Sequence, residues 1–374
     1  MSITSSLSKP AGSDTDPNAT PALQLRALRK CFGAVEAVAG VDLALRSGEF
    51  LTLLGPSGSG KTTILKMIAG FERPTAGAIE LAGRDVSTLS PAERGIGVVF
   101  QQYALFPHMS VHDNIAYPLK LRRRPAAERA RRVEAMLALV ELTGYGARFP
   151  RELSGGQQQR VAVARALAFE PALLLMDEPL GALDRALRVG MQEEIRRIHR
   201  ESGATILYVT HDQEEALTMS DRVAIMREGR LLQVGPPRDL YRRPADRFVA
   251  TFFGECTLVP ATLLAAPDAE HVRVAALGRE ATVRRGGPLS ENDISLAIRP
   301  GKLRVRPAPD DLPLPTRVID VLYLGDSVRI VGRNPAAGEV LVRADPDEAA
   351  AVAIGQELTF GFAAADAVAV GGSR

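Results

Sequence analysis

Apolar residues change their spacing along this chain, and the spacing predicts where strands and helices form. Between Leu23 and Ala250, short apolar runs typical of buried strands alternate with segments in which apolar residues recur every three or four positions. This alternation favours an α/β fold with a mixed, largely parallel sheet covered by helices. The predicted strands are Phe50 to Leu54, Ile96 to Phe100, Leu173 to Asp177, Thr205 to Thr210 and Arg222 to Met226.

Helix starts and stops are marked between these strands. Gly70 ends an apolar repeat that begins near Ile64, and Ser90 to Glu93 contains the serine, proline and glutamate of a helix start with a capping box. Glu193 and Arg197 are expected to pair on the exposed face of a further helix. The predicted buried stripe of that helix is Leu187, Met191, Ile195 and Ile198.

The segment from Tyr117 to Phe149 is predicted to be a helical insertion, and it is strongly basic. Its arginines are expected to form a solvated face, with lipid headgroups or nucleic acid as alternative contacts. The arginines concerned are Arg122, Arg123, Arg124, Arg129, Arg131 and Arg132.

After Phe253 the pattern changes to short apolar runs broken by proline, glycine and aspartate, which predicts a small all-β domain with an OB-like barrel. From Thr257 onward the aromatic residues are Tyr323, Phe360 and Phe362 alone, a poor platform for stacking bases, so nucleic acid is not an expected partner. The predicted strands are Ser295 to Arg299, Thr316 to Leu322, Ser327 to Val331 and Leu358 to Phe362.

A chain of 374 residues exceeds the usual size of one hydrophobic core, so about two to three domains are expected. Residues 1–21, rich in Ser, Thr, Pro and Asp, are predicted to be a disordered tail without a secretory signal. The nucleotide-binding part is predicted over residues 22–253, with a helical subdomain at about 102–165, and the β-rich part over 254–374.

Composition narrows the class of protein further. Charged residues make up 24% of the chain and the formal net charge is +2, which gives no long-range attraction to a polyanion. Cys31 and Cys256 have no metal-binding spacing, which fits a reducing cytoplasm. No stretch of ~18 consecutive apolar residues occurs, so a membrane role requires a partner.

The clearest chemistry lies in Gly55-Pro56-Ser57-Gly58-Ser59-Gly60-Lys61-Thr62-Thr63, which matches the P-loop pattern between a predicted strand and a predicted helix. Glycines let backbone amides approach an anion, and the helix N-terminus adds positive charge. Lys61 is predicted to reach the β- and γ-phosphates of ATP, and Thr62 to bind Mg²⁺. The alternative is a glycine-rich turn that binds nothing.

Two carboxylates and a second glycine-rich helix start complete this chemistry. Asp177 ends an apolar strand and is predicted to hold Mg²⁺, while Glu178 is predicted to activate the attacking water. Ser154-Gly155-Gly156-Gln157 precedes a predicted helix from Gln158 to Ala168 and forms a second candidate phosphate cradle. One ATP needs only one P-loop, so the second cradle is expected to close over nucleotide held by another subunit.

These motifs, together with Gln158-Gln159-Arg160 and His211, closely resemble the ATPase subunit of ATP-binding cassette (ABC) transporters over roughly Leu23 to Ala250. The resemblance implies an ATP hydrolase that works as a head-to-tail dimer of two copies, with two ATP molecules between the P-loop and the Ser154 to Gln157 signature. Phe32 resembles the aromatic that stacks on adenine, with a core role as the alternative. Gln101 resembles the glutamine that contacts Mg²⁺ and water.

The resemblance also assigns His211 as the switch histidine at the γ-phosphate and Asp184 to the loop that crosses the dimer interface. Gly181 is a departure, because importers of this type often have serine there, and a contact across the interface is then missing.

Tyr103 to Val111 is typical of importer ATPases whose solute arrives on a separate binding protein outside the cell. Leu105, Phe106 and Met109 are expected to be exposed and to form a socket for a permease subunit; the alternative is that they pack internally. The protein is therefore expected at the cytoplasmic face of the inner or plasma membrane, held there by the permease.

Ala297 to Gly301 and Val321 to Ser327 resemble the small barrel appended to importer ATPases, and Leu324 to Ser327 is most similar to the polyamine branch. Import of polyamines such as spermidine and putrescine is therefore expected. Ferric iron, 2-aminoethylphosphonate, sugar or glycerol-phosphate, and sulfate are alternative solutes. A non-transport ABC ATPase acting on DNA or ribosomes is a more distant alternative, and a regulatory ligand or protein for the barrel remains open.

Overall fold

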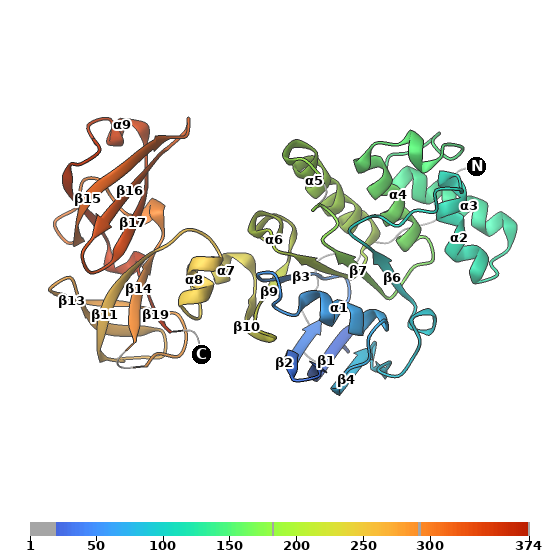
Figure 1. Cartoon of the computed structure of the whole chain (residues 1–374), viewed down its shortest axis with the longest axis horizontal. Helices are drawn as coiled ribbons and strands as arrows, with labels where there is room; N and C mark the ends of the chain where they lie inside the picture. Colours follow the sequence, from blue (N-terminus) through green and yellow to red (C-terminus); the bar gives the residue numbers. More distant parts are fainter. Residues whose placement is uncertain (1–19, 182, 291–292, 373–374) are drawn as a thin grey trace, which may run out of the picture.

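The computed structural model describes residues 20–181, 183–290 and 293–372. The predicted disordered tail lies almost wholly outside the described residues. The N-terminal two thirds of the chain form an α/β part, and the remainder forms a β-rich part. Helices α7 and α8 lie between the two parts (Figure 1). No helix among the described residues is long and apolar enough to span a membrane.

Two sheets form the α/β part. An antiparallel sheet has the order β2-β1-β4-β5, and a six-stranded sheet has the order β10-β9-β3-β8-β7-β6. In the second sheet all neighbours are parallel except β9 and β10, which confirms the predicted mixed, largely parallel arrangement. The strands are β1 (Leu23–Phe32), β2 (Val35–Leu45), β3 (Phe50–Leu54), β4 (Ala76–Leu81), β5 (Arg84–Asp85), β6 (Ile96–Val99), β7 (Leu173–Asp177), β8 (Ile206–Thr210), β9 (Arg222–Arg227) and β10 (Arg230–Gly235).

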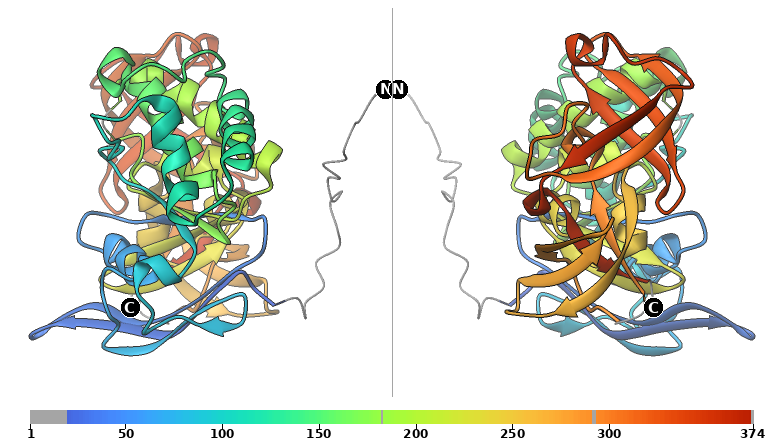
Figure 2. Two further views of the ribbon diagram at one scale, coloured as in Figure 1. Left: turned by 90° about the vertical axis from the view of Figure 1, so that its right-hand side faces the viewer. Right: turned by 90° about the vertical axis from the view of Figure 1, so that its left-hand side faces the viewer.

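Both faces of the large sheet are buried, which explains why its strands read as continuous apolar runs. On β7, Leu173 and Leu175 pack toward α1 and the antiparallel sheet, whereas Leu174 and Met176 pack toward the helices on the other face. Figure 2 shows these helices and the antiparallel sheet at opposite ends of the α/β part. The helices are α1 (Lys61–Ala69), α2 (Val111–Leu121), α3 (Ala126–Leu139), α4 (Gly155–Leu167), α5 (Arg185–Ser202) and α6 (Gln213–Met219).

Several local expectations were wrong. Ser90 to Glu93 does form a capping box, but it starts only a 3₁₀ turn, because Gly95 takes a positive φ and β6 begins one residue later. Leu187 is 47% exposed, so the buried stripe of α5 lacks its first member. Arg197 pairs with Glu194 and Glu201 rather than with Glu193.

The predicted helical insertion is two helices followed by an irregular segment over residues 140–149. Its arginines are not all solvated. The Arg122 guanidinium lies 3.6 Å from the centre of the Phe169 ring, and Arg132 donates to the Ala168 carbonyl at 2.9 Å and pairs with Glu170. These contacts fasten the two helices to the end of α4.

The β-rich part contains more strands than its sequence pattern predicted. A closed barrel is formed by β11-β12-β13-β19-β14, and a four-stranded sheet by β17-β16-β15-β18; both share one apolar core. The pattern missed β11, β12, β13, β17 and β19. The strands are β11 (Thr257–Ala265), β12 (His271–Ala276), β13 (Arg279–Arg285), β14 (Ile294–Ile298), β15 (Leu312–Tyr323), β16 (Val328–Asn334), β17 (Gly338–Ala344), β18 (Glu357–Phe362) and β19 (Val368–Gly371); one short helix, α9 (Pro346–Ala349), follows β17.

Helices α7 (Pro237–Arg242) and α8 (Arg247–Phe252) join the two parts. Leu240 of α7 packs in the same small apolar cluster as Ala216 of α6 and Leu54 of β3. Ala250 of α8 instead packs with Val368 of β19 in a separate cluster. The two helices therefore touch both the large sheet and the barrel.

Candidate nucleotide-binding site

The P-loop connects β3 to α1 through glycines that other residues could not replace without strain. Gly60 has a φ of 100°, and a Cβ on it would lie 2.5 Å from the Ala37 carbonyl oxygen. A Cβ on Gly55 would lie 2.3 Å from the Met226 carbonyl oxygen. These close approaches bring the loop backbone to the end of the sheet, where free amides and the α1 N-terminus attract anions.

Lys61, at the end of this loop, is buried, with an exposed fraction of 5%. Its ammonium donates to the Gly55 and Pro56 carbonyls at 2.7 and 3.0 Å. Burial lowers the pKa of Lys61, while the carboxylates of Glu178 and Asp177 oppose that shift. The cation is thus held at the centre of the loop by groups that a phosphate can displace.

The acidic residues meet the P-loop because β7 lies two strands from β3 and ends at the same edge. Thr62 Oγ1 is 3.5 Å from Asp177 Oδ1, so a hydroxyl and a carboxylate face each other across the site. Burial, and then the charge of Glu178, raise the pKa of Asp177. An ionised Asp177 is therefore destabilised here, and a nearby cation would relieve that cost.

Glu178 follows the strand end and has a φ of 44°, uncommon for a residue with a side chain. Its amide donates to the Val209 carbonyl at 2.9 Å, which fixes the backbone against β8. Its carboxylate lies 3.2 Å from Nδ1 of His211, which follows β8 directly. The structure thus brings together the predicted general base and the predicted switch histidine.

Gln101 lies two residues past β6, in an exposed turn. A Cβ on Gly181 would lie 3.3 Å from its Nε2 atom. Gly181, where serine was expected for an importer of this type, therefore adjoins Gln101, and a Cβ at this position would contact the Gln101 amide closely. Ala182 lies outside the described residues.

Ser154 caps α4 by accepting a hydrogen bond from the Gln157 amide, and Gln157 Oε1 accepts one from the Ser154 amide. A Cβ on Gly155 would lie 3.5 Å from Leu183, so the signature adjoins the loop that ends at Asp184. Among the described residues, no hydrogen bond or ion pair joins this signature to the P-loop. Within one chain, the two predicted phosphate cradles are separate.

Asp184 caps α5, where its carboxylate accepts from the Leu187 amide at 3.0 Å. The adjoining Arg188 pairs with Asp212 at 3.2 Å, and Asp212 in turn caps α6 directly after His211. Arg188, which links the start of α5 to the residue after His211 through this ion pair, was not singled out from the sequence. Its only signal was its position one helical turn after Asp184.

Phe32 ends β1 and is 47% exposed, which argues against a role in the core. The Lys30 ammonium lies 4.7 Å from the centre of its ring. A planar ring left open at the surface offers a face on which a nucleobase can stack.

Leu105, Phe106 and Met109 were expected to be exposed, and this expectation was wrong: all three are half-buried. Leu105 packs against the apolar core, and Phe106 lies 4.7 Å from the Tyr117 ring. Arg165 holds the preceding turn by donating to the carbonyls of Ala104 and Tyr103 at 2.8 and 3.1 Å. The segment is thus packed into the helical part while retaining partial access to solvent.

Comparison with known proteins agrees with this geometry. The ABC transporter family matches residues 38–181, and the TOBE domain family matches residues 296–370. The spermidine/putrescine import ATP-binding protein of Rubrobacter xylanophilus is 46% identical over 357 residues, covering 94% of both chains. The protein of the same name from Acidothermus cellulolyticus is 47% identical and covers 89% of both.

Solved structures resemble the α/β part. The cassette cbiO1 of Clostridium perfringens, part of a transporter complex, superimposes with a TM-score of 0.56 at 28% identity, covering 59% of this chain and 91% of that one. The dimeric bacterial ABC transporter cassette MJ0796 gives a TM-score of 0.51 at 33% identity and covers 57% and 98%. Since relatives match nearly the whole chain at close to half identity, it belongs to the ABC transporter ATP-binding proteins with a C-terminal TOBE domain, and it is an ATP hydrolase.

Proposed function

We propose that this protein powers the import of polyamines, such as spermidine and putrescine, by binding and hydrolysing ATP in a dimer attached to a separate permease. The observation that carries the solute class is the 46% identity, over 94% of the chain, to a spermidine/putrescine import ATP-binding protein. The catalytic assignment rests on the meeting of P-loop, Asp177, Glu178 and His211 at one sheet edge. Ferric iron, 2-aminoethylphosphonate, sugar or glycerol-phosphate, and sulfate remain the competing solutes.

In this proposal the P-loop amides and Lys61 bind the β- and γ-phosphates of ATP. Glu178 accepts a proton from the attacking water. In the nucleotide-free chain its carboxylate lies 3.2 Å from His211 Nδ1, so in this proposal the carboxylate turns away from His211 to reach the water. His211 then donates to the γ-phosphate, and Phe32 stacks on the adenine.

The oxygens of Thr62, Asp177 and Gln101 fit a magnesium ion. Mg²⁺ prefers oxygen ligands and keeps several from phosphate and water, so it needs few from the protein. Among the described residues, no group of three or more His, Cys, Asp or Glu side chains is placed to hold a metal by itself. When bound, Mg²⁺ would offset negative charge on the transferring phosphate.

Closure of the site requires a second copy of the chain. Among the described residues, no hydrogen bond or ion pair joins Ser154 to Gln157 to the P-loop of the same chain, and a capped helix start can bind the γ-phosphate of nucleotide held by a partner. In the proposed dimer, two such signatures close over two ATP molecules. Release of phosphate and ADP after hydrolysis would let the two copies separate and the permease return to its starting state.

The proposed permease contact is the segment around Phe106, which follows Gln101 and reports nucleotide state to the membrane. Attachment through the permease would place this chain at the cytoplasmic face of the membrane. A solute-binding protein on the other side would act only indirectly.

The test is copurification of this chain with its permease and binding protein, followed by uptake in reconstituted vesicles. Spermidine and putrescine should be transported with ATP consumption, and Lys61→Ala should abolish both activities. Uptake of ferric iron or 2-aminoethylphosphonate without polyamine uptake would overturn the solute class while leaving the ATPase assignment intact. ATP-dependent action on DNA or ribosomes without any permease would overturn the transport function itself.

A further inference from the structure

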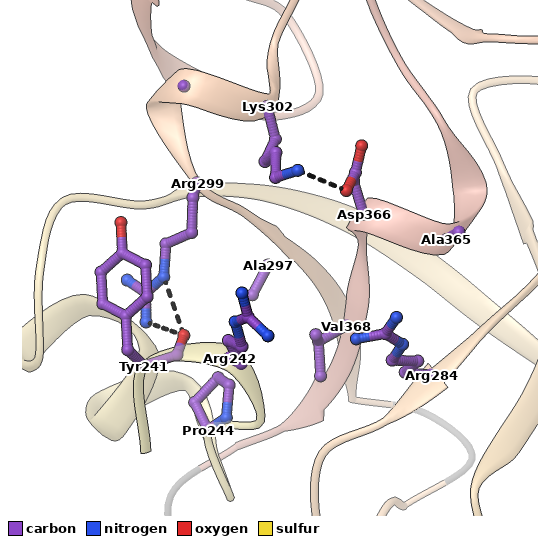
Figure 3. A pocket seen from close by; sticks show the side chains of 11 residues that line it. Tyr241, Arg242, Pro244, Arg284, Ala297, Arg299, Lys302, Ala365, Asp366 and Val368 are labelled. Atoms are coloured by element: carbon purple, nitrogen blue, oxygen red, sulfur yellow. Dashed lines mark hydrogen bonds and ion pairs between the residues drawn. The ribbon is translucent and has the colours of Figure 1, made fainter. Parts of the chain in front are cut away.

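A cavity of about 390 Å³ lies where α7 meets the C-terminal barrel, away from the P-loop (Figure 3). Its lining combines α7 residues, including Tyr241 and Arg242, with Arg284 of β13, Arg299 after β14, and Lys302. This volume is within the range of pockets that hold small molecules. Since both parts of the chain contribute, a ligand here would bridge them.

The lining carries a strong excess of positive charge. Arg242, Arg284, Arg299 and Lys302 face one acid among the described lining residues, Asp366. Asp366 pairs with Lys302 at 2.9 Å, which neutralises that lysine. Three arginine charges around one cavity therefore have no carboxylate partner within the part of the chain that the structure describes.

Arg299 is fixed in place by carbonyl groups. Its guanidinium donates to the Tyr241 carbonyl at 2.8 Å and the Ala250 carbonyl at 2.7 Å, and it lies 4.1 Å from the centre of the Tyr241 ring. Carbonyl oxygens satisfy its N–H groups without cancelling its charge. A guanidinium anchored in this way costs little further entropy when it attracts an anion.

Arg242 and Arg284 form no ion pair or side-chain hydrogen bond with any described residue. Figure 3 shows their guanidinium groups on either side of Val368, which also lines the cavity. The ordinary explanation of such arginines is a solvated surface. Convergence of both on one hollow, beside a third uncompensated arginine, favours a binding role, because cavities lined by one sign of charge concentrate the field.

We propose that this cavity binds a small soluble anion bearing phosphate groups, held by Arg242 and Arg284 and attracted by Arg299. Planar guanidinium groups bind phosphate oxygens in pairs, and two arginines on either side of Val368 (Figure 3) match a ligand with more than one anionic group. The positive lining disfavours a polyamine cation. The proposal therefore concerns a different ligand from the transported solute.

The position of the cavity also gives the ligand a physical route to the ATPase part. Tyr241 and Arg242 end α7, whose Leu240 packs with Ala216 of α6, the helix that follows His211. A ligand that ties α7 to the barrel would restrict movement of α7 against α6.

The experiment titrates pyrophosphate into the full chain carrying Lys61→Ala, which weakens phosphate binding by the P-loop, at 150 mM salt in a calorimeter. We expect saturable binding at one site per chain. Adding Arg242→Gln and Arg284→Gln together should weaken binding about a hundredfold, since each replaces one charge-assisted contact. The matched control is Arg243→Gln, whose side chain pairs with Glu270 outside the cavity lining, and it should bind as tightly as its parent.

Absence of saturable binding, or equal affinity with and without the paired arginine changes, would overturn the proposal. Tighter binding of citrate than of pyrophosphate would overturn the phosphate class. Thermal melting of each variant without ligand checks that the fold survives. Arg242 and Arg284 are exposed, so we expect the melting temperature to stay close to that of the parent. ATP turnover of the chain with Lys61 intact is measured separately, so failure here is distinct from failure of the proposed function.

Discussion

Glu178 occupies a backbone conformation that side chains rarely adopt, at the point where the proposed chemistry occurs. Its φ of 44° is maintained by the Val209 carbonyl beneath it, and its carboxylate faces His211. Strain of this kind persists only where the surrounding structure enforces it. At the scale of single residues, the orientation of the Glu178 and His211 side chains therefore defines the site.

We expect Glu178→Gln to slow ATP hydrolysis about a hundredfold or more, because an amide cannot accept the proton of the attacking water. Nucleotide binding should remain, since Gln keeps the size of the side chain. Phosphate release and ATP binding are measured on the same preparation. The control is Glu170→Gln, at an exposed glutamate that shares the positive φ, and it should retain wild-type turnover; equal rates in both variants would remove Glu178 from catalysis.

Asp177 gives a pH-dependent prediction for the nucleotide-free chain. Burial raises the pKa of this carboxyl above its unfolded value, so the folded protein holds the proton more tightly. Stability from this group is present at low pH and is lost as pH rises through the folded pKa. Asp177→Asn should therefore raise the free energy of unfolding at pH 7.5, and the gain should shrink as pH falls toward the carboxyl range.

Urea unfolding at pH 7.5 and pH 5 measures this difference. The exposed Asp310→Asn serves as the control and should show no comparable gain. A variant at Asp177 that is less stable than wild type at pH 7.5 would contradict the assigned direction.

At the scale of elements, several residues of the proposed site lie at the N-terminal ends of helices. Gly60 and Lys61 begin α1, Ser154 begins α4, and Asp184 begins α5. Each start leaves amides that a cap or a ligand must satisfy. The cap of α4 therefore has two roles in the proposed function, because the same residues stabilise the helix and close over a partner's nucleotide.

Ser154→Ala separates these roles when it is compared with Ser110→Ala, which removes an equivalent cap from α2. Each change should lower the free energy of unfolding by about 1 kcal/mol. Only Ser154→Ala should also weaken ATP-dependent dimer formation, observed by light scattering in a Glu178→Gln background. An equal effect of both changes on dimerisation would show that helix stability alone is responsible.

At the scale of the whole molecule, the contact between the α/β part and the barrel depends on Arg299. Its guanidinium donates to carbonyls on and after α7 and α8, at Tyr241, Ala250, Gly254 and Glu255. The residue limits predicted for the two parts, 22–253 and 254–374, remain predictions. The contact itself is a specific arrangement of hydrogen bonds.

Arg299→Ala should loosen this contact, because the carbonyl of the buried Ala250 loses its donor, and a buried carbonyl without a donor costs about 1–3 kcal/mol. We expect faster proteolysis near Gly254 and a separate, lower melting transition for the barrel. Arg333→Ala, an exposed arginine on β16, is the control and should be cut at the wild-type rate. Unchanged proteolysis of the Arg299 variant would show that apolar packing alone holds the contact.

Local patterns were a good guide to the buried strands of the large sheet. The strands β3, β7 and β8 are apolar on both faces, and their sequence limits were predicted to within a residue. In the barrel, β13 has charged pairs at both ends and was missed; it closes the barrel by pairing with β19, which lies some eighty positions later in the chain. The burial of Phe106 likewise depends on residues that are distant in sequence, such as Arg165, whose guanidinium lies 5.5 Å from the centre of the Phe106 ring.

The sequence by itself determined the family, the α/β sheet, the P-loop and the capped helix starts, because glycines, caps and apolar runs act over a few neighbouring residues. Tertiary structure alone decided that Glu178 faces His211, that Gly181 adjoins Gln101, and that arginines from α7, from β13 and from the residue after β14 line one cavity. These arrangements arise where separate elements meet. Their geometry is set by packing of the whole chain, so no local pattern encodes it.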